Sequence, residues 1–530
     1  MLGLTDLSLI PSSAIQNIAI ASGSGNTSYG EKGGGSIFLK TKNPTNEIGT
    51  SQAFGSFGKT ITESFAGFKY KNWKLSLFTR FENSDNNYIY ATREFSNQAG
   101  VFIDVEKKRE NNELSSKTGI LNLSWQKNQK EFFSTLWLYD ASNNIPGGIS
   151  SPSPEATQKD SYFRFMNRYS TKIYGKKFTS KFYINRQQLD FINPASNINS
   201  LSTSNTLSGD FELELKLNQK LEVITSSQIG YSFVNASDYA DIAKRTQVSI
   251  QSHPVWNLSK RITFFSGIRL DYYSDFKEAF SINMGTNIRL IANKLYLKGQ
   301  LSRNFVAPTF NDLYWPGLGN QELQPETNLQ SEGGLIFQQV FPKIYHSIEL
   351  IGYKGLIKDG IRWLPDNNGQ SRPENLEEVG VSGFEIKNKL TFQYDQLQLE
   401  INSILLHSVA SLQEARFDGD RAEGKQLRYT PEWLVKLNTK FIWKNLGSIF
   451  YLNFTEERFT TADHSSPFDP LPSYSDASWS TFLNIEKGNF RFSPQFTVQN
   501  LFDKEYTIIR DYPMPGRNYL VKLTIKYKLR

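Results

Sequence analysis

The residue types that carry out chemistry are present in this sequence, but their spacing does not assemble an enzyme site. Serine, histidine and aspartate occur throughout the chain, yet no local motif brings a nucleophile next to a base. The glycine-rich stretch 23–35 lacks the Gly-Lys-Ser/Thr ending of a phosphate-binding loop. Cysteine is absent from the 530 residues, which excludes disulfides, thiolate metal sites and cysteine nucleophiles. We therefore expect a protein that is not an enzyme.

Metal ligands of the nitrogen and oxygen types are scattered rather than clustered. The four histidines are isolated from one another and are expected to be ordinary structural residues, namely His253, His346, His407 and His464. Ca²⁺ takes six to eight oxygen ligands from flexible loops. The aspartates best placed to supply them, without a recognisable ligand spacing, are Asp238, Asp241, Asp418 and Asp420. No cofactor is therefore expected, and calcium in the loops stays an open alternative.

Charge and hydropathy exclude two further classes of protein. The 59 Lys+Arg and 52 Asp+Glu leave a net charge of +7, spread without a block of five like charges, so nucleic acid is not implied as a partner. No stretch approaches the roughly 20 apolar residues of a membrane helix. Residues 1–18 also lack the regions of a secretory signal. The chain is therefore expected either to stay inside the cell or to lack its true beginning.

Apolar residues recur at every second position in segment after segment, which predicts β-strands with one apolar and one polar face. In the last segment, Tyr519, Val521 and Leu523 alternate with Lys522 and Thr524. About 22 such segments follow residue 48, each near the roughly 9 to 11 residues with which a tilted strand crosses a bilayer. They begin near residues 49, 61, 73, 118, 131, 161, 177, 205, 221, 246, 261, 279, 295, 328, 347, 381, 397, 431, 447, 478, 490 and 518.

The connections between these strands alternate between short and long. Tight turns such as 71–72 and 175–176 alternate with long connections such as 84–117, 304–327 and 363–380. A membrane β-barrel has this pattern, because its turns on one rim are short and its loops on the other are extended. A large soluble all-β protein, the alternative, gives no reason for it. The expected fold class is all-β, a transmembrane antiparallel β-barrel of about 22 strands, closed so that every backbone amide is paired.

The lumen of such a barrel is too wide for the wall side chains to fill, and barrels of this size are normally plugged. Residues 1–48 are the candidate plug material. Within them, 14–21 and 36–42 are predicted strands on either side of a glycine-rich loop. A flexible Gly/Ser linker is the alternative for this segment.

Three stretches, in the same order along the chain, resemble signatures of the TonB-dependent outer-membrane receptors. Residues 15–42 resemble the C-terminal end of that family's plug domain, and residues 303–327 and 498–517 resemble its mid-barrel and C-terminal signatures. The residues that carry the plug resemblance are Tyr29, Gly30, Gly34 and Gly35. Those of the mid-barrel signature are Ala307, Pro308, Asn311, Leu313, Tyr314, Pro325 and Glu326. Those of the C-terminal signature are Asn500, Leu501, Phe502, Tyr506, Gly516 and Arg517.

The resemblance implies a multi-pass receptor in the lipid of the cell outer membrane. Such a receptor imports a scarce metal chelate, such as a siderophore or cobalamin, with energy from the TonB energy-coupling complex, and some members have a surface lipoprotein partner. It also implies two domains: the C-terminal remnant of a plug, 1–48, and a transmembrane barrel with long extracellular loops, 49–530. We expect the coupling segment and most of the plug to be absent from this chain. The alternative function is therefore a passive outer-membrane pore or a non-functional fragment.

The resemblance places ligand capture in the external loops, where aromatic and polar side chains give shape and hydrogen bonds. The candidate ligand-binding residues are Tyr314, Trp315, Arg362, Trp363 and Arg372. The alternative is that they are membrane-interface aromatics and solvated loop charges. Haem is a less favoured cargo, because haem receptors of this family carry a histidine within the mid-barrel signature and none lies between Pro308 and Gln324 here.

Overall fold

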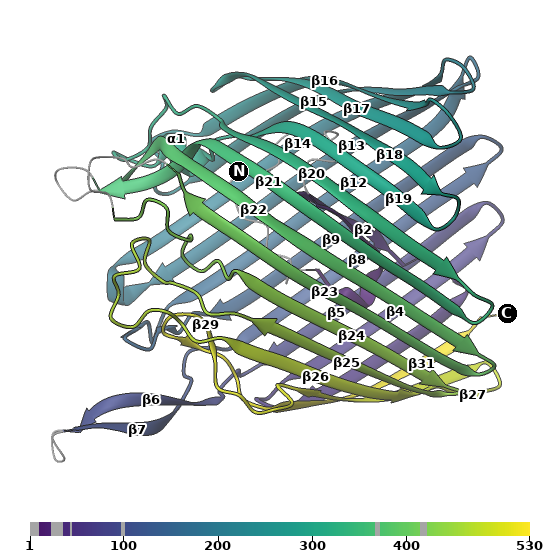
Figure 1. The fold of residues 1–530 in the computed structure, drawn as a ribbon. Helices are drawn as coiled ribbons and strands as arrows, with labels where there is room; N and C mark the ends of the chain where they lie inside the picture. The colour runs from purple at the N-terminus through teal and green to yellow at the C-terminus, as the bar shows by residue number, and fades with distance from the viewer. Residues whose placement is uncertain are drawn as a thin grey trace.

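The computed structural model describes residues 10–22, 35–42, 45–96, 101–365, 371–413 and 421–529. In this part of the chain, 22 antiparallel strands form a closed barrel, with β26 and β27 counted as one interrupted strand (Figure 1). The barrel closes where the last strand, β31, pairs with the first, β3. The barrel strands are β3 (Glu47–Gly55), β4 (Thr60–Tyr70), β5 (Trp73–Ser84), β8 (Leu114–Lys127), β9 (Lys130–Asn144), β12 (Thr157–Ile173), β13 (Lys176–Asn193), β14 (Ile198–Lys216), β15 (Leu221–Ala236), β16 (Ala243–Asn257), β17 (Ile262–Tyr273), β18 (Lys277–Ile291), β19 (Leu295–Val306), β20 (Glu326–Val340), β21 (Ile344–Pro365), β22 (Ser371–Tyr394), β23 (Leu397–Leu412), β24 (Trp433–Trp443), β25 (Leu446–Thr455), β26 (Tyr474–Leu483), β27 (Ile485–Lys487), β28 (Phe490–Gln499) and β31 (Asn518–Lys528).

Shorter elements are not part of the barrel wall. The hairpin of β6 and β7 projects away from the barrel at one end (Figure 1). These elements are η1 (Ser12–Ala14), β1 (Ile15–Ser22), β2 (Gly35–Thr41), β6 (Ile89–Ser96), β7 (Val101–Lys108), β10 (Gly147–Gly148), β11 (Ser151–Pro152), η3 (Pro194–Ser196), α1 (Phe310–Tyr314), β29 (Thr507–Ile509) and β30 (Tyr512–Pro513). Among the described residues, no helix is long and apolar enough to cross a bilayer.

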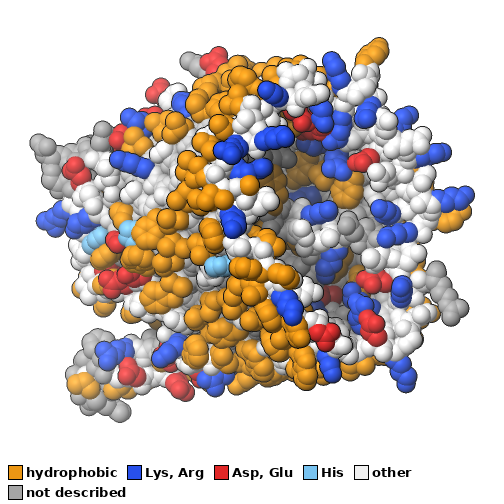
Figure 2. Space-filling view, turned by 45° about the vertical axis from the view of Figure 1, so that its right-hand side comes forward, with side chains coloured by type: hydrophobic (Ala, Val, Ile, Leu, Met, Phe, Trp, Pro, Cys, Tyr) orange, Lys and Arg blue, Asp and Glu red, His pale blue; other side chains and the backbone are white. Residues whose placement is uncertain are grey.

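The two faces of the barrel wall differ as the period-two pattern predicts. On β31, the side chains of Tyr519, Val521 and Leu523 are exposed on the outside. Lys522, between them, reaches Glu63 of β4, with 2.6 Å between its Nζ and a carboxylate oxygen. Many wall strands repeat this alternation, so apolar side chains form a wide band around the outer surface (Figure 2). Such a band matches the hydrocarbon layer of a membrane.

The predicted strand number is confirmed, and the predicted alternation of connections is confirmed in part. All connections at one end of the barrel, the turn end, are short, and the long connections all lie at the other, the loop end (Figure 1). The β3–β4, β13–β14 and β17–β18 connections, however, are short although they also lie at the loop end. Several turns contain residues with positive φ, such as Asn128 at 55°, Gly175 at 76° and Asp395 at 49°. This left-handed conformation fits tight hairpin turns, because it matches the twist of the flanking strands.

The expected long loop 363–380 is wrong in part. Strands β21 and β22 continue past the barrel wall and pair with each other up to Pro365 and Ser371, with a register shift near Gly360. In such a two-stranded extension, the backbone groups that face each other are hydrogen-bonded between the two strands, so no further wall strand is needed to pair them. The alternation of apolar and polar residues marks only the part of a strand that crosses the bilayer. It therefore could not reveal this extension, which lies outside the bilayer.

Strands β1 and β2 pair in antiparallel fashion and form what we call the inner hairpin, which lies inside the barrel (Figure 1). Ile18 lies opposite Leu39, and Ile20 opposite Ile37. The strands predicted at 14–21 and 36–42 are thus present, and Gly35 begins β2. The other residues of the plug resemblance, Tyr29, Gly30 and Gly34, lie outside the described residues. The division into domains at residue 48 stays a prediction.

Candidate ligand-binding site

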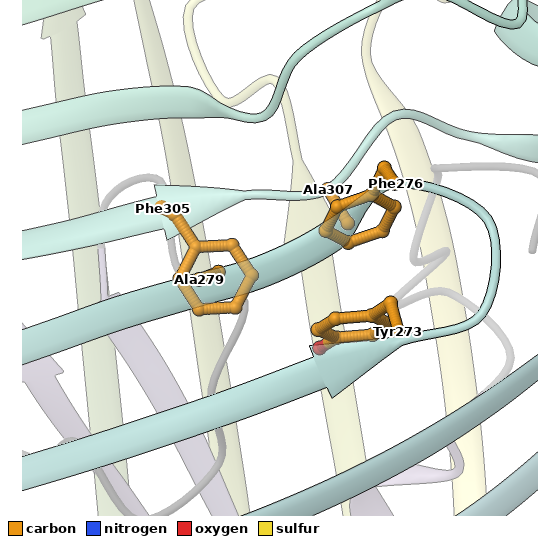
Figure 3. Close-up of a cluster of buried hydrophobic side chains, with 5 residues drawn as sticks. All are labelled: Tyr273, Phe276, Ala279, Phe305 and Ala307. Carbon is orange, nitrogen blue, oxygen red and sulfur yellow. The ribbon is translucent and has the colours of Figure 1, made fainter.

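The connection from β19 to β20 begins by packing against the loop end of the barrel wall. Ala307 joins a buried cluster with Tyr273, Phe276, Ala279 and Phe305 (Figure 3). The rings of Tyr273 and Phe276 stack with 4.3 Å between their centroids. The start of this long connection is therefore anchored by apolar packing.

An arginine of β16 fixes the next residues of the connection. The Arg245 guanidinium shares its one Nε–H between the two Asp275 carboxylate oxygens, at 3.0 and 2.8 Å, and donates from a terminal nitrogen to the Pro308 carbonyl at 2.8 Å. Its carbon Cζ also lies 4.9 Å from the ring centroid of Phe310. A charged group buried in this way is stable because its donors are paired.

Helix α1 follows directly, and its start has a complete capping box. The Thr309 hydroxyl accepts the backbone N–H of Asp312 at 3.2 Å, and the Asp312 carboxylate accepts the backbone N–H of Thr309 at 2.8 Å. This arrangement satisfies two helix-end donors at once. The buried side chains of Phe310 and Leu313 hold the helix against the wall.

The same aspartate joins the connection to the extension of β21 and β22. Trp363 donates its Nε1–H to the other Asp312 carboxylate oxygen at 2.9 Å. The rings of Trp315 and Trp363 meet edge to face, with 6.4 Å between centroids and an interplanar angle of 85°. Farther along, Asn320 donates to the Pro373 carbonyl at 3.1 Å. We call residues 307–325, 358–365 and 371–379 together the paired loop unit.

The structure places the five candidate ligand-binding residues in three different surroundings. Trp315 and Trp363 are in contact, and Trp315 is 39% exposed. Arg362 and Arg372 lie on the paired strands of the extension, opposite Glu374 and Leu364 respectively. Tyr314 instead packs against Phe310 and the buried cluster beside it. Burial, with the negative charge of Asp275, raises the pKa of Tyr314. The ligand-binding role of all five stays a prediction.

Other residues of the mid-barrel signature hold the paired loop unit together. The Tyr239 hydroxyl donates to Asn311 at 2.5 Å, and burial with the nearby Asp312 raises the pKa of Tyr239 to about 12. The Glu326 carboxylate accepts the backbone N–H of Ile361 at 2.8 Å. Leu313 is buried, and Pro325 lies immediately before β20. These signature residues position the loops.

The C-terminal signature builds the connection between β28 and β31. The Asn500 amide donates to the carbonyls of Lys504 and Pro515, at 2.8 and 3.2 Å, and its oxygen accepts the Lys504 N–H at 3.0 Å. The Arg517 side chain donates to the Leu501 carbonyl at 3.1 Å. Asn500 is 3% exposed, so these contacts replace its lost hydration.

The remaining C-terminal signature residues also have structural contacts. Tyr506 stacks on Tyr474 with 4.5 Å between ring centroids, and burial with the nearby Asp476 raises its pKa to about 12. A Cβ at Gly516 would lie 3.0 Å from an Asp503 carboxylate oxygen, so a side chain there requires that carboxylate to shift. The ring of Phe502 is exposed.

A cavity of about 750 Å³ lies between the start of the inner hairpin and the barrel wall, and sequence reasoning missed it. Its lining includes Ser12, Tyr88, Arg109, Tyr139 and Tyr512. The Arg109 guanidinium lies over the Tyr512 ring, with 5.9 Å from Cζ to the centroid. Its lining residues come from six separate segments of the chain, so no local motif could reveal it. Its volume is within the roughly 300–1,000 Å³ of small-molecule sites.

Comparison with known proteins decides the family. The family model described as "TonB dependent receptor-like, beta-barrel" matches residues 22–501. The chain belongs to the TonB-dependent receptor family. It is therefore an outer-membrane protein that crosses the bilayer with strands, and the resemblance stated from the sequence is confirmed.

Curated relatives of this receptor include two vitamin B12 transporters named BtuB. The one from Vibrio vulnificus is 27% identical over 307 residues, which are 56% of this chain and 44% of the relative. The one from Photobacterium profundum is 26% identical over 251 residues, 45% of this chain and 36% of the relative. The matched region thus spans less than half the length of these relatives.

Solved structures of receptors share the fold at low sequence identity. The siderophore receptor PirA from Acinetobacter baumannii superposes with a TM-score of 0.77 at 15% identity, covering 99% of this chain and 87% of that one. The FrpB iron transporter from Neisseria meningitidis superposes with a TM-score of 0.77 at 11% identity, covering 98% and 88%. The relatives found by sequence and structure are transporters and receptors.

Inside this receptor, one buried carboxylate connects the inner hairpin to the wall. Glu63 accepts hydrogen bonds from Ser51 at 3.0 Å, from Arg80 at 2.6 Å and from Lys522 at 2.6 Å. It also accepts the hydroxyl of Ser13, from the turn just before β1. A cavity of about 670 Å³ lies beside this network, and Lys42 lines it. Burial, with the charge of Lys526, lowers the pKa of Lys42.

The receptor's histidines lie in wall strands and loops. His346 lies 2.8 Å from the Asn388 side chain, and His407 lies beside Phe384 and Trp433. His464 stacks on a phenylalanine, and His253 is in β16.

Within the described ranges, no three or more His, Cys, Asp or Glu side chains come together in a group that could hold a metal ion. Asp238 accepts a hydrogen bond from Ser200, and Asp241 lies in the same loop. Asp418 and Asp420 lie outside the described residues, so calcium binding in the loops stays an untested alternative.

Proposed function

We propose that this receptor captures a scarce chelate of the siderophore or cobalamin kind outside the cell and passes it inward through the barrel. The observation that carries the proposal is the cavity of about 750 Å³ between the inner hairpin and the wall at the loop end. It has the size of a small-molecule site, and part of its boundary belongs to a segment separate from the wall. Movement of that segment would release a bound ligand.

The side chains around the cavity favour a polar ligand with aromatic or anionic groups. Arg109 supplies a cation, and the hydroxyls of Tyr88, Tyr139 and Tyr512 can orient a ligand by hydrogen bonds. Tyr88 already donates to the Pro513 carbonyl at 2.6 Å, which fixes its ring. The similarity to two vitamin B12 transporters supports cobalamin as the ligand. The similarity in fold to siderophore receptors supports a ferric siderophore as the other candidate ligand.

The paired loop unit would make the first contact with the ligand. The edge-to-face pair of Trp315 and Trp363 offers an aromatic surface, and Arg362 and Arg372 add positive charge on adjacent strands. Aromatic surfaces with nearby cations suit planar and anionic chelates. The proposed partners are the TonB energy-coupling complex and a surface lipoprotein.

Uptake by the source bacterium tests the proposal. The gene is deleted, and uptake of radiolabelled cyanocobalamin and of a panel of ferric siderophores is measured. Restoration with the wild-type gene is compared with a Trp315→Ala/Trp363→Ala variant and with Tyr174→Ala, a control at a turn where the side chain is 99% exposed. We expect uptake of one chelate class to be lost on deletion and restored by the wild type and the control.

The double tryptophan variant is expected to reduce that uptake at least tenfold at limiting ligand concentration. Unchanged uptake of every chelate after deletion would refute the proposal. Large constant conductance of the purified chain in a planar bilayer would instead support the passive pore.

A further inference from the structure

A second recess lies on the outside of the barrel, away from the lumen. It has a volume of about 780 Å³ and covers strands β18 to β23. Most of its lining side chains share the outer face with Leu301, which is 56% exposed. Cross-strand pairing proves the common face, because Met284, Leu301, Ser331 and Lys354 lie opposite one another on consecutive strands.

The recess exists because small residues replace large ones in the middle of this apolar surface. Its floor is formed by Gly380, Ser382 and Ser411 on the adjoining strands β22 and β23, together with Ser331 on β20. Leucines border the floor, among them Leu301, Leu329 and Leu356. The shape is a shallow groove with apolar sides, which suits a hydrocarbon chain.

Two cations stand in the same groove. Arg303 is half-buried, and its guanidinium donates to the Phe280 carbonyl and, at 3.5 Å, to the Thr327 hydroxyl. These contacts fix the guanidinium while leaving further N–H donors. Lys354 lies on β21, two strands along the wall from Arg303 on β19, and is exposed. Arg303 is close to the loop end, since β19 ends at Val306. Cross-strand pairing connects Lys354 through Ser331 to Leu301 of the same strand β19.

Acidic partners for these cations are not found within the described residues of the strands. Glu349 pairs with Lys298, and Glu378 pairs with Lys358. Cations on the lipid-facing surface are costly when buried in hydrocarbon and are tolerated near the membrane interface. The position of Arg303 at the loop end corresponds to the headgroup region of the outer leaflet.

We infer that this groove binds a phosphorylated lipid of the outer leaflet. The lipid phosphate lies between Arg303 and Lys354, because guanidinium groups bind phosphate through paired hydrogen bonds and ammonium groups add a point charge. An acyl chain follows the groove past Leu301, Leu329 and Leu356. This site is separate from the lumen and holds whether or not the imported chelate is the one proposed.

Lipid exchange into the purified receptor tests the inference. The receptor is placed in nanodiscs of neutral lipid and titrated with lipid A or its dephosphorylated form, and binding is followed by native mass spectrometry. The variant is Arg303→Gln/Lys354→Gln. The control, Lys343→Gln, removes a charge at the turn end of the same β20–β21 hairpin. Heat-dependent migration in electrophoresis verifies that each variant is a folded barrel.

We expect phosphorylated lipid A to bind the wild type and the control at least tenfold more tightly than it binds the double variant. Dephosphorylated lipid A is expected to bind all three equally weakly. Lys354→Arg is expected to retain binding, because it keeps the charge. Equal affinity of the double variant and the wild type would overturn the inference. Displacement of the lipid by millimolar inorganic phosphate would also overturn it, because the site would then recognise phosphate without the acyl chains.

Discussion

The contact between Ser13 and Glu63 makes a sharp prediction about how the inner hairpin is held. Ser13→Ala removes the hydroxyl that reaches Glu63 and leaves every wall contact of that carboxylate in place. The substitution should therefore loosen the inner hairpin without weakening the barrel. Glu63→Gln should do both, because Arg80 and Lys522 also lose a charged partner.

The magnitude follows from the chemistry of the contact. A hydrogen bond to a charged group contributes about 1.5–3 kcal/mol. Since each 1.4 kcal/mol is a factor of ten, Ser13→Ala should raise the population of the released hairpin about ten- to a hundredfold. Breaking the buried ion pairs of Glu63 should cost the barrel about 3–5 kcal/mol as well.

The natural absence of cysteine provides the assay. Ala14 is 6% exposed and follows Ser13, so Ala14→Cys introduces one protected thiol. Its rate of labelling by a maleimide reports how often the segment leaves the wall. The rate is measured in the parent, with Ser13→Ala, and with Ser12→Ala as the matched control, because Ser12 is exposed.

We expect faster labelling with Ser13→Ala, a parent-like rate with Ser12→Ala, and an unchanged unfolding temperature of the barrel in both. A labelling rate with Ser13→Ala within threefold of the parent would refute the reasoning. So would a large fall in the unfolding temperature, because the hydroxyl would then be part of the barrel's own stability.

Three further predictions concern the loops. Asn500→Ala should lower barrel stability by about 2–3 kcal/mol, because three buried hydrogen bonds are lost, and thermal unfolding should show no such change for the control Lys504→Ala. Hydrogen bonds from Thr460 and Thr461 outweigh burial and hold the pKa of Asp469 below its usual value of 3.8. The ionised Asp469 carboxylate should therefore stabilise the loop above about pH 3.8, and this stabilisation should be lost as the pH falls through the lowered pKa. Pepsin digestion of loop 456–473 in the parent should accelerate over that pH range. In Asp469→Asn, digestion of the loop should be insensitive to the same change of pH. Trp363→Phe should keep the aromatic contact but lose the bond to Asp312, loosening the paired loop unit by about 1.5–3 kcal/mol, and hydrogen exchange of residues 310–315 should speed up; unchanged exchange would show that the bond is not needed.

The strands of the barrel could be predicted because their signal is local. On β31, apolar Tyr519 and Val521 alternate with Lys522, and this alternation follows from the geometry of any strand with lipid on one face and water on the other. The turns were equally readable, since β4 ends at Tyr70 and β5 begins at Trp73, leaving two residues between them.

The family signatures were visible in the sequence, but their role was not. Asn500 and Glu326 hold loops by hydrogen bonds to backbone atoms 4 to 35 residues away. The sequence predicts Tyr314 and Trp315 together as ligand-binding residues, and the structure adds that the Tyr314 ring packs against Phe310 while the Trp315 ring contacts Trp363. Adjacent residues at a one-turn helix point in different directions, and these directions cannot be predicted from a sequence motif alone.

Strand number, the strand boundaries at the turn end and the two faces of the wall were therefore determined by the sequence alone, because each depends on residues that are near one another in the chain. The tertiary structure decided the remainder. Closing the barrel brings Ser13 to Glu63 and Lys522, and it places Arg303 and Lys354 in one groove. Those neighbours are set by strand register and by the curvature of the closed wall, which are properties of all 22 strands together.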